Sequence, residues 1–370
     1  MTLIENMMRI EVKPTINLYL DDSWTRGLSK FFRFISGKLF GASIRQFENA
    51  VAILLAGGVS ERWRKSLPNK AEPKHKACAP LGEGLSPIQR TLMGLHRHGI
   101  KRARIVLPSV TERAVCEEIV GYLRPYNSEL FMSIKAVDGT PSLVQSLAKG
   151  FNDLKGEWEG DVIVSYSDII CPTVMLEALM SNTNQDIVVL VDRAWEKNYP
   201  DSRTWHDKRY AELAFGHGGK FEDAGEIICS FPQLQTLTPD IQTLLNRDNL
   251  CLGEVVGLYK FTRAGREAFL DCCKTVGNGD IPLPNFTGKY ELALPEGMTP
   301  KKTESIDRIL LATFLAYVAQ KQKINIGIEC VSGPRWFEID FWEDAKRIER
   351  FLPYWDSCTG EISRGAPLES

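Results

Sequence analysis

The sequence predicts an α/β fold with a doubly wound, mainly parallel sheet. From residue 49 onward, short apolar segments rich in β-formers alternate with longer segments that have helical periodicity. The first short segment, AVAILLAGG, ends in two glycines, as a buried parallel strand does when it enters a tight loop. With 370 residues, of which 44% are hydrophobic, the chain can bury a substantial core.

The elements expected after this first strand follow in strand–helix order. The expected strands are Ala103 to Pro108, Ser133 to Asp138, Asp161 to Ile170, a strand that begins at Asp186, and Gly253 to Thr262. The expected helices are Pro87 to His98, about Thr111 to Leu123, one that starts within Gly139 to Phe151, and about Trp342 to Phe351. Parallel strands need long crossover connections, so this alternation favours a sheet with helices on both faces.

We expect three regions along the chain. Residues 1–48 form an N-terminal extension, residues 49–352 form the α/β domain, and residues 353–370 form a C-terminal tail. In the extension, hydrophobic residues recur at helical spacing between residues 28 and 39, which predicts a helix packed on the domain or on a second subunit. A membrane-surface helix is disfavoured because the segment is short and has no second anchoring signal.

Composition and charge argue against several classes of protein. The net charge of −2 disfavours a protein that coats nucleic acid. No run approaches the ~20 apolar residues of a membrane span, and the five histidines lack the spacing of a zinc site. The nine cysteines contain no CxxC pair, which favours reduced thiols in a cytoplasmic protein. A homo-oligomer stays an open alternative.

The loop after the first strand has the features of an anion-binding loop. Gly57 and Gly58 allow backbone angles closed to other residues and expose main-chain N–H groups at close range. Six basic residues follow, at positions 62, 64, 65, 70, 74 and 76. The loop matches neither GxxxxGK[ST] nor GxGxxG, which disfavours a Walker-type ATPase and a dinucleotide fold. A polyphosphate site is indicated, and an ordinary turn with a solvated basic face is the alternative.

Two segments here resemble the opening signature of the nucleotidyltransferases that activate phosphorylated sugars and related small molecules. They are LAGGVSER, Leu55 to Arg62, and HKACAPLGEGLSPIQRTL, His75 to Leu92. The resemblance implies a Rossmann-like, GT-A-type nucleotidyltransferase fold with an acceptor-binding lobe at about 186–300. It implies Lys76 as the catalytic lysine, with Lys74 as an alternative, and Leu55, Ala56, Gly57 and Gly58 as nucleotide-binding residues. His75 and Ser60 replace the proline and glycine of the signature, which leaves the loop conformation open.

Two carboxylates are candidates for a magnesium site. Asp168 lies in the small-residue turn near the end of the segment DVIVSYSDII, at the carboxyl end of a parallel strand, where α/β sheets bind ligands. Asp340 lies in GPRWFEIDFWED, which resembles the closing segment of the same family. Hard carboxylate oxygens are the ligands that Mg²⁺ prefers, so the resemblance assigns both residues to Mg²⁺. The structural alternatives are a turn aspartate for Asp168 and a helix N-cap for Asp340.

Further segments suggest where the two substrates bind. The resemblance makes Gly139, Thr140 and Ser142 contacts of the nucleotide, although the same residues also suit an ordinary helix start. VDRxW and the later GExxGLxKF look like the cytidylyltransferase branch that acts on phosphonates, phosphocholine and similar head groups. In that resemblance the acceptor-binding residues are Asp192, Glu254 and Asp307. The aromatics Trp195, Tyr199 and Trp205 suit a quaternary amine, or else they pack the lobe.

The resemblance implies Mg²⁺-dependent transfer of CMP from CTP to a phosphate- or phosphonate-bearing small molecule, with release of pyrophosphate. Lys76, Arg62 and Asp168 are the implied catalytic residues. A sugar-1-phosphate uridylyl-, guanylyl- or adenylyltransferase is the nearest alternative, and a non-catalytic nucleotide-binding regulator is the other. A nucleotide-sugar glycosyltransferase is disfavoured because SYSDII contains a lone aspartate instead of a DxD pair.

Overall fold

The structure is a computed structural model of the 370-residue chain. It describes residues 49–58, 60–68, 73–81, 84–109, 112–124, 133–192, 213–215, 251–282, 303–322, 324–331, 336–350 and 352. All of these lie within the unit Ala42–Ser370. The N-terminal extension, the C-terminal tail and most of the acceptor lobe expected at 186–300, with its three aromatics, lie outside the described residues.

One sheet organises the described part of the chain. Its strand order is β11-β6-β8-β4-β1-β2-β3, with β7 paired to β8. The strands are β1 Ala50–Leu55, β2 Arg102–Leu107, β3 Ser133–Asp138, β4 Asp161–Tyr166, β6 Ile187–Asp192, β7 Leu213–Phe215, β8 Cys251–Phe261 and β11 Ile326–Val331. β8 runs antiparallel to β4, β6 and β7, and the other pairs are parallel. The predicted mainly parallel sheet is therefore confirmed.

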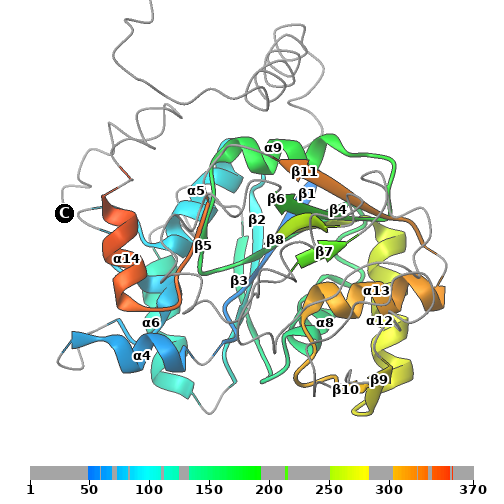
Figure 1. The fold of residues 1–370 in the computed structure, drawn as a ribbon, viewed down its shortest axis with the longest axis horizontal. Coiled ribbons are helices and arrows are strands. Elements are labelled where there is room, and N and C mark those ends of the chain that lie inside the picture. The colour runs from blue at the N-terminus through cyan, green and yellow to red at the C-terminus, as the bar shows by residue number, and fades with distance from the viewer. Residues whose placement is uncertain are drawn as a thin grey trace, which may run out of the picture. The chain divides into compact units, whose positions relative to one another are not determined.

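Helices cover both faces of this sheet (Figure 1). On one side are α5 Pro87–Arg97, α6 Arg113–Leu123 and α9 Thr173–Ser181; on the other are α8 Leu143–Leu154, α12 Arg263–Val276 and α13 Leu311–Gln322. The sequence of β1 explains how one strand serves two cores. Ala52 and Leu54 pack in the core of α5, whereas Val51 and Ile53 pack in the core of α8, because successive strand side chains point to opposite faces.

The chain changes direction across the sheet at β1. From β1 it moves outward through β2 to β3, with α5 and α6 on one face, and then returns through α8 on the other face to β4. β1 therefore lies between β2 and β4, and its two crossovers lie on opposite faces. Such a switch point leaves a crevice outside the carboxyl ends of the strands, where ligands bind in open α/β sheets.

A smaller cluster attaches the C-terminal segment near this crevice. The strand expected over Asp161 to Ile170 breaks after Tyr166, and β5 Ile169–Ile170 pairs antiparallel with β12 Phe337–Glu338. Buried side chains of these strands pack with Trp63 of α4 Glu61–Ser66 and with α14 Trp342–Glu349. The rings of Trp63 and Trp342 lie 5.7 Å apart between centroids. This packing fixes the position of the residues around β12.

The segment around Asp307 lies between a short strand and a helix. β10 Thr303–Ser305 precedes it and pairs with β9 Asp280–Pro282, and α13 starts at Leu311. Among the described residues, no helix has the length and apolarity to cross a bilayer.

Candidate active site

The glycine loop leaves β1 at the carboxyl edge of the sheet. The Ala56 N–H donates to the Val106 carbonyl at 2.8 Å, and the Ser167 N–H donates to the Leu55 carbonyl at 3.2 Å. These bonds join the ends of β1, β2 and β4. Within the described ranges, the N–H groups of Gly57 and Gly58 have no hydrogen-bond partner. Of the four predicted loop residues, these two therefore have main-chain donors that no described group satisfies.

Gly139 and Thr140 lie beside this loop. A Cβ on Gly139 would lie 1.9 Å from the Leu107 carbonyl oxygen, so only glycine fits where β3 ends. The hydroxyl of Ser146 in α8 accepts from the Thr140 N–H at 2.9 Å and donates to the Thr140 carbonyl at 3.0 Å. The same hydroxyl lies 3.4 Å from a Cβ built on Gly57. Ser146, which the sequence did not single out, therefore fixes the turn against the glycine loop.

Ser142 has a structural position. It is the N-cap of α8, where its hydroxyl accepts from the Gln145 N–H at 3.2 Å. The hydroxyl also donates to the Ile306 carbonyl at 2.6 Å, and the residue is fully buried. The helix-start alternative therefore accounts for this side chain, and a nucleotide contact by Ser142 stays a prediction.

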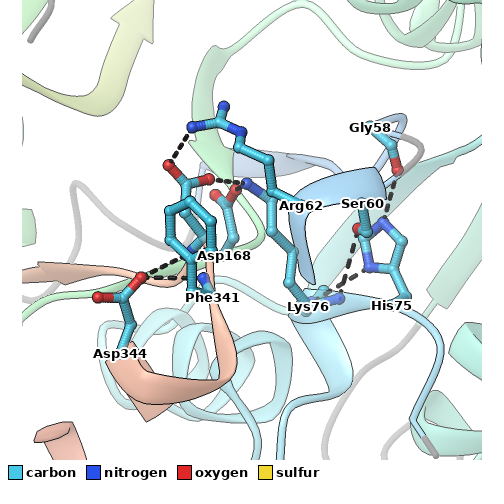
Figure 2. A network of polar contacts seen from close by, with 10 residues as sticks. Gly58, Ser60, Arg62, His75, Lys76, Asp168, Phe341 and Asp344 are labelled. Atoms are coloured by element: carbon cyan, nitrogen blue, oxygen red, sulfur yellow. Dashed lines mark hydrogen bonds and ion pairs between the residues drawn. The ribbon is translucent and has the colours of Figure 1, made fainter. Parts of the chain in front are cut away.

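Lys76 lies between the two candidate carboxylates (Figure 2). Its ammonium nitrogen is 2.6 Å from Asp168 Oδ2 and 2.8 Å from Asp340 Oδ1. The three side chains are 15%, 13% and 10% exposed, respectively. Arg62 reaches the other oxygen of Asp340 at 2.8 Å, from a half-exposed position at the start of α4. Lys74, the alternative lysine, is exposed.

The pairing of β5 with β12 brings Asp168 and Asp340 together. The Ile339 N–H donates to the Asp168 carbonyl at 3.0 Å, continuing that ladder by one bond. Asp340 is not a helix cap: the N-cap of α14 is Phe341, and the Asp344 carboxylate accepts from the N–H groups of Asp340 and Phe341 at 3.0 and 2.9 Å. The Asp340 side chain is left to face Lys76 and Arg62.

The electrostatics of this cluster keep Lys76 charged. Burial disfavours the ammonium form, but the carboxylates of Asp168 and Asp340 outweigh burial and raise the pKa of Lys76 above its ordinary value. The lysine therefore supplies a permanent positive charge that neutralises two nearly buried carboxylates.

The donor set fits a magnesium ion. Asp168 Oδ1 is buried and has no hydrogen-bond partner among the described residues, a costly arrangement unless a ligand completes it. Mg²⁺ is commonly held by one or two carboxylates, with phosphates and waters as its other ligands. No group of three or more metal-binding side chains occurs in the described part of the chain. Asp168 and Asp340 therefore suit a cation that arrives with a phosphate.

The turn that carries Lys76 is held by residues which the sequence did not identify as functional. The Glu118 carboxylate in α6 accepts from the N–H groups of Lys74 and His75 at 3.0 and 3.3 Å. The indole N–H of Trp63 donates to the Pro73 carbonyl at 2.8 Å. An acid in mid-helix and a buried tryptophan have no local pattern that distinguishes such a role, so only the tertiary structure identifies them.

The predicted acceptor residues divide into a pair and an outlier. Asp192 and Glu254 are direct partners across β6 and β8, and both are buried. The indole N–H of Trp336 donates to Asp192 Oδ2 at 3.1 Å. Asp307 is exposed on the turn between β10 and α13, where its N–H donates to the Ser305 hydroxyl. The structure thus brings two of the three acidic residues together.

No protein-family model matches this chain, and no curated protein matches its sequence. Solved structures similar to this chain include the following two. One is the inositol-1-phosphate CTP transferase from T. maritima, which is 13% identical, with a TM-score of 0.49 over 84% of this chain and 97% of that one. The other is a putative glucose-1-phosphate thymidylyltransferase from Bacillus anthracis in complex with a sucrose, which is 15% identical, with a TM-score of 0.51 over 86% and 98%. The second likeness establishes the Rossmann-like fold.

Proposed function

We propose that this chain is a nucleotidyltransferase that transfers a nucleoside monophosphate, with CMP from CTP favoured, to a phosphate- or phosphonate-bearing small molecule. The observation that carries the proposal is the placement of Lys76 between Asp168 and Asp340, beside a glycine loop at the switch point. Fixed positive charge, two hard carboxylates and main-chain donors are the groups needed to bind a triphosphate.

In the proposed reaction an oxygen of the acceptor attacks the α-phosphorus of the triphosphate. The new bond joins that oxygen to the α-phosphorus, and the bond from the α-phosphorus to the oxygen leading to the β-phosphate breaks. The electron pair leaves with pyrophosphate. A dianionic acceptor is already ionised, so no general base is required. The protein must bring two anions together and spread the developing charge.

Each residue of the cluster has a task in this scheme. The N–H groups of Gly57 and Gly58 cradle the nucleotide at the end of β1. The Lys76 ammonium neutralises the α-phosphate once it turns from the carboxylates. Arg62 has a half-exposed guanidinium that can follow the β- and γ-phosphates as pyrophosphate departs. Asp168 and Asp340 would hold Mg²⁺, which supplies Lewis acidity and a template for phosphate oxygens.

Preference for CTP rests on the segments around Asp192 and Glu254, which resemble the cytidylyltransferase branch. Their buried pairing places two acidic side chains side by side, which suits an acceptor with a cationic head group. Six cysteines in the described part of the chain are free thiols, which favours a cytoplasmic enzyme. A sugar-1-phosphate nucleotidyltransferase is the second candidate, favoured by the description of the Bacillus anthracis structure.

Calorimetry with CTP, UTP, GTP, ATP and dTTP in the presence of Mg²⁺ tests the proposal. We expect CTP to bind most tightly and Lys76→Ala to weaken that binding at least about tenfold, because a phosphate loses its charged partner. Lys65→Ala is the matched control, since Lys65 is exposed and pairs with Glu61 one turn away. Preference for another base would select the sugar-phosphate alternative. If none of the five triphosphates binds, the proposed nucleotidyltransferase activity is refuted.

A further inference from the structure

His75 joins the glycine loop to the turn that carries Lys76. The residue is 1% exposed, and both of its ring nitrogens contact backbone groups. Nε2 lies 2.9 Å from the Gly58 carbonyl oxygen, and the Ala77 N–H donates to Nδ1 at 3.1 Å. Because Nδ1 accepts, the proton of the neutral ring is on Nε2, which donates to Gly58. One ring therefore holds its own turn and reaches across to the loop (Figure 2).

A second hydrogen bond joins the same two segments, again donated from the turn to the loop. The Lys76 N–H donates to the Ser60 hydroxyl at 3.4 Å. Ser60 has a φ of 51°, in the left-handed region that non-glycine residues seldom occupy. Such a conformation persists where surrounding contacts maintain it. The loop and the turn are thus joined by a histidine on one side and a serine on the other.

The pair replaces the glycine and proline of the resembled signature. A proline at position 75 has no ring nitrogen with a proton to donate, and a glycine at position 60 has no hydroxyl to accept. Burial lowers the pKa of His75 to about 4, so the ring is neutral near pH 7 and keeps its single donor. The Glu118 carboxylate holds the His75 N–H from the other side of the turn.

We propose that His75 is a positioning residue which couples the Gly57–Gly58 loop to Lys76. Both ring nitrogens contact backbone groups of the chain, so the ring acts by setting the spacing between the main-chain donors of the loop and the Lys76 ammonium, which bind the same triphosphate in the proposed function. Its effect on nucleotide binding rests on the proposed function, whereas the coupling of the two segments does not.

Two substitutions separate the two contacts of the ring. In His75→Asn the side-chain oxygen takes the place of Nδ1, so it can accept from Ala77 but cannot reach Gly58. In His75→Gln the side-chain amide nitrogen takes the place of Nε2, so it can donate to Gly58 but leaves Ala77 without its acceptor. The two variants are matched in chemistry and differ in which hydrogen bond they keep.

Hydrogen–deuterium exchange on the free protein tests the coupling. In His75→Asn we expect faster exchange of the Lys76 amide, which donates to Ser60 of the loop, with the Ala77 amide still protected. In His75→Gln we expect faster exchange of the Ala77 amide and unchanged exchange of the Lys76 amide. Unchanged exchange at Lys76 in His75→Asn overturns the proposal. Nitrogen NMR on the wild type is the second test, and a ring protonated on Nδ1 overturns the proposal whatever the variants do.

Nucleotide affinity tests the consequence. At equal thermal stability, we expect Mg–CTP to bind about tenfold more weakly to His75→Asn and within about threefold of the wild type to His75→Gln. Equal affinities in both variants, despite the expected exchange pattern, would refute the positioning role. If the wild type binds none of the five triphosphates, the proposed function fails, while the exchange pattern still decides whether His75 couples the segments.

Discussion

Lys76→Met should destabilise the free protein strongly, because it removes a charge from between two nearly buried carboxylates. Methionine keeps most of the apolar stem and loses the ammonium, which lies 2.6 and 2.8 Å from Asp168 and Asp340. Breaking a buried ion pair by removing one partner costs about 3–5 kcal/mol. Arg62 still pairs with Asp340 in the variant, so mainly Asp168 loses its partner. We therefore expect the free energy of unfolding to fall by about 3 kcal/mol, at the lower end of that range.

Urea unfolding at pH 7 measures this loss, with Lys65→Met as the control. Lys65 forms an exposed ion pair with Glu61 one turn away, and such solvent-screened pairs add little to stability. The double variant Lys76→Met with Asp168→Asn should regain stability, because it removes the unpaired charge. Equal losses for the two lysine variants, or no recovery in the double variant, would refute the reasoning.

Magnesium adds a third comparison without nucleotide. The cation and the Lys76 ammonium compete for the charge of the same two carboxylates, so we expect saturating Mg²⁺ to return about 2–3 kcal/mol of unfolding free energy to Lys76→Met and to change the wild type much less. An equal response of both proteins would place Mg²⁺ binding away from Asp168 and Asp340.

Three further predictions use other residues of the site. Gly58→Ala should change the free energy of unfolding by less than about 0.5 kcal/mol, since its Cβ would meet nothing within 4 Å, yet it should weaken CTP binding in calorimetry. Gly139→Ala should lower the free energy of unfolding by more than about 2 kcal/mol in urea, because its Cβ would lie 1.9 Å from the Leu107 carbonyl oxygen. Ser60→Gly should be about 1 kcal/mol more stable than Ser60→Ala, because only glycine adopts a φ of 51° without strain; equal denaturation midpoints would contradict this. Burial lowers the pKa of His75 in the folded state from 6.5 to about 4, so on acidification the unfolded state takes up the proton first. The free energy of unfolding should therefore fall by about 3 kcal/mol between pH 6.5 and pH 4, at about 1.36 kcal/mol per pH unit. His75→Gln should remove that part of the pH slope in urea titrations from pH 7 to 4.

The local sequence pattern is sufficient to predict the strands and helices in the parallel half of the sheet. The strand expected at Ser133 to Asp138 has those bounds as β3, and the helix expected at Pro87 to His98 ends one residue earlier as α5. Apolar periodicity reports which side chains are buried, and burial is what these elements share. Strand direction is harder to predict from sequence. The sequence predicts a strand at β8, but its antiparallel position between β4 and β6 depends on partners far away in the chain.

The candidate site likewise has features that the sequence predicts and features that only the structure shows. Glycines after a strand, a lysine-rich segment and two isolated aspartates are local features, and their resemblance to one family identifies Lys76, Asp168 and Asp340 as candidates. Neither residue pattern nor spacing indicates that Asp344 holds the backbone at the start of α14 while Asp340 faces the lysine. Both are acids near the start of one helix, and either suits a cap.

The sequence by itself therefore determined the fold class, the glycine loop and the residue types of the candidate site, because backbone freedom, burial and charge are properties of single residues and short segments. Only the tertiary structure decided that Asp340 meets Asp168 through the β5–β12 pairing, and that His75 and Ser60 join the loop to the lysine turn. Hydrogen bonds between distant segments depend on the order of strands in the sheet, and no local pattern in the chain encodes that order.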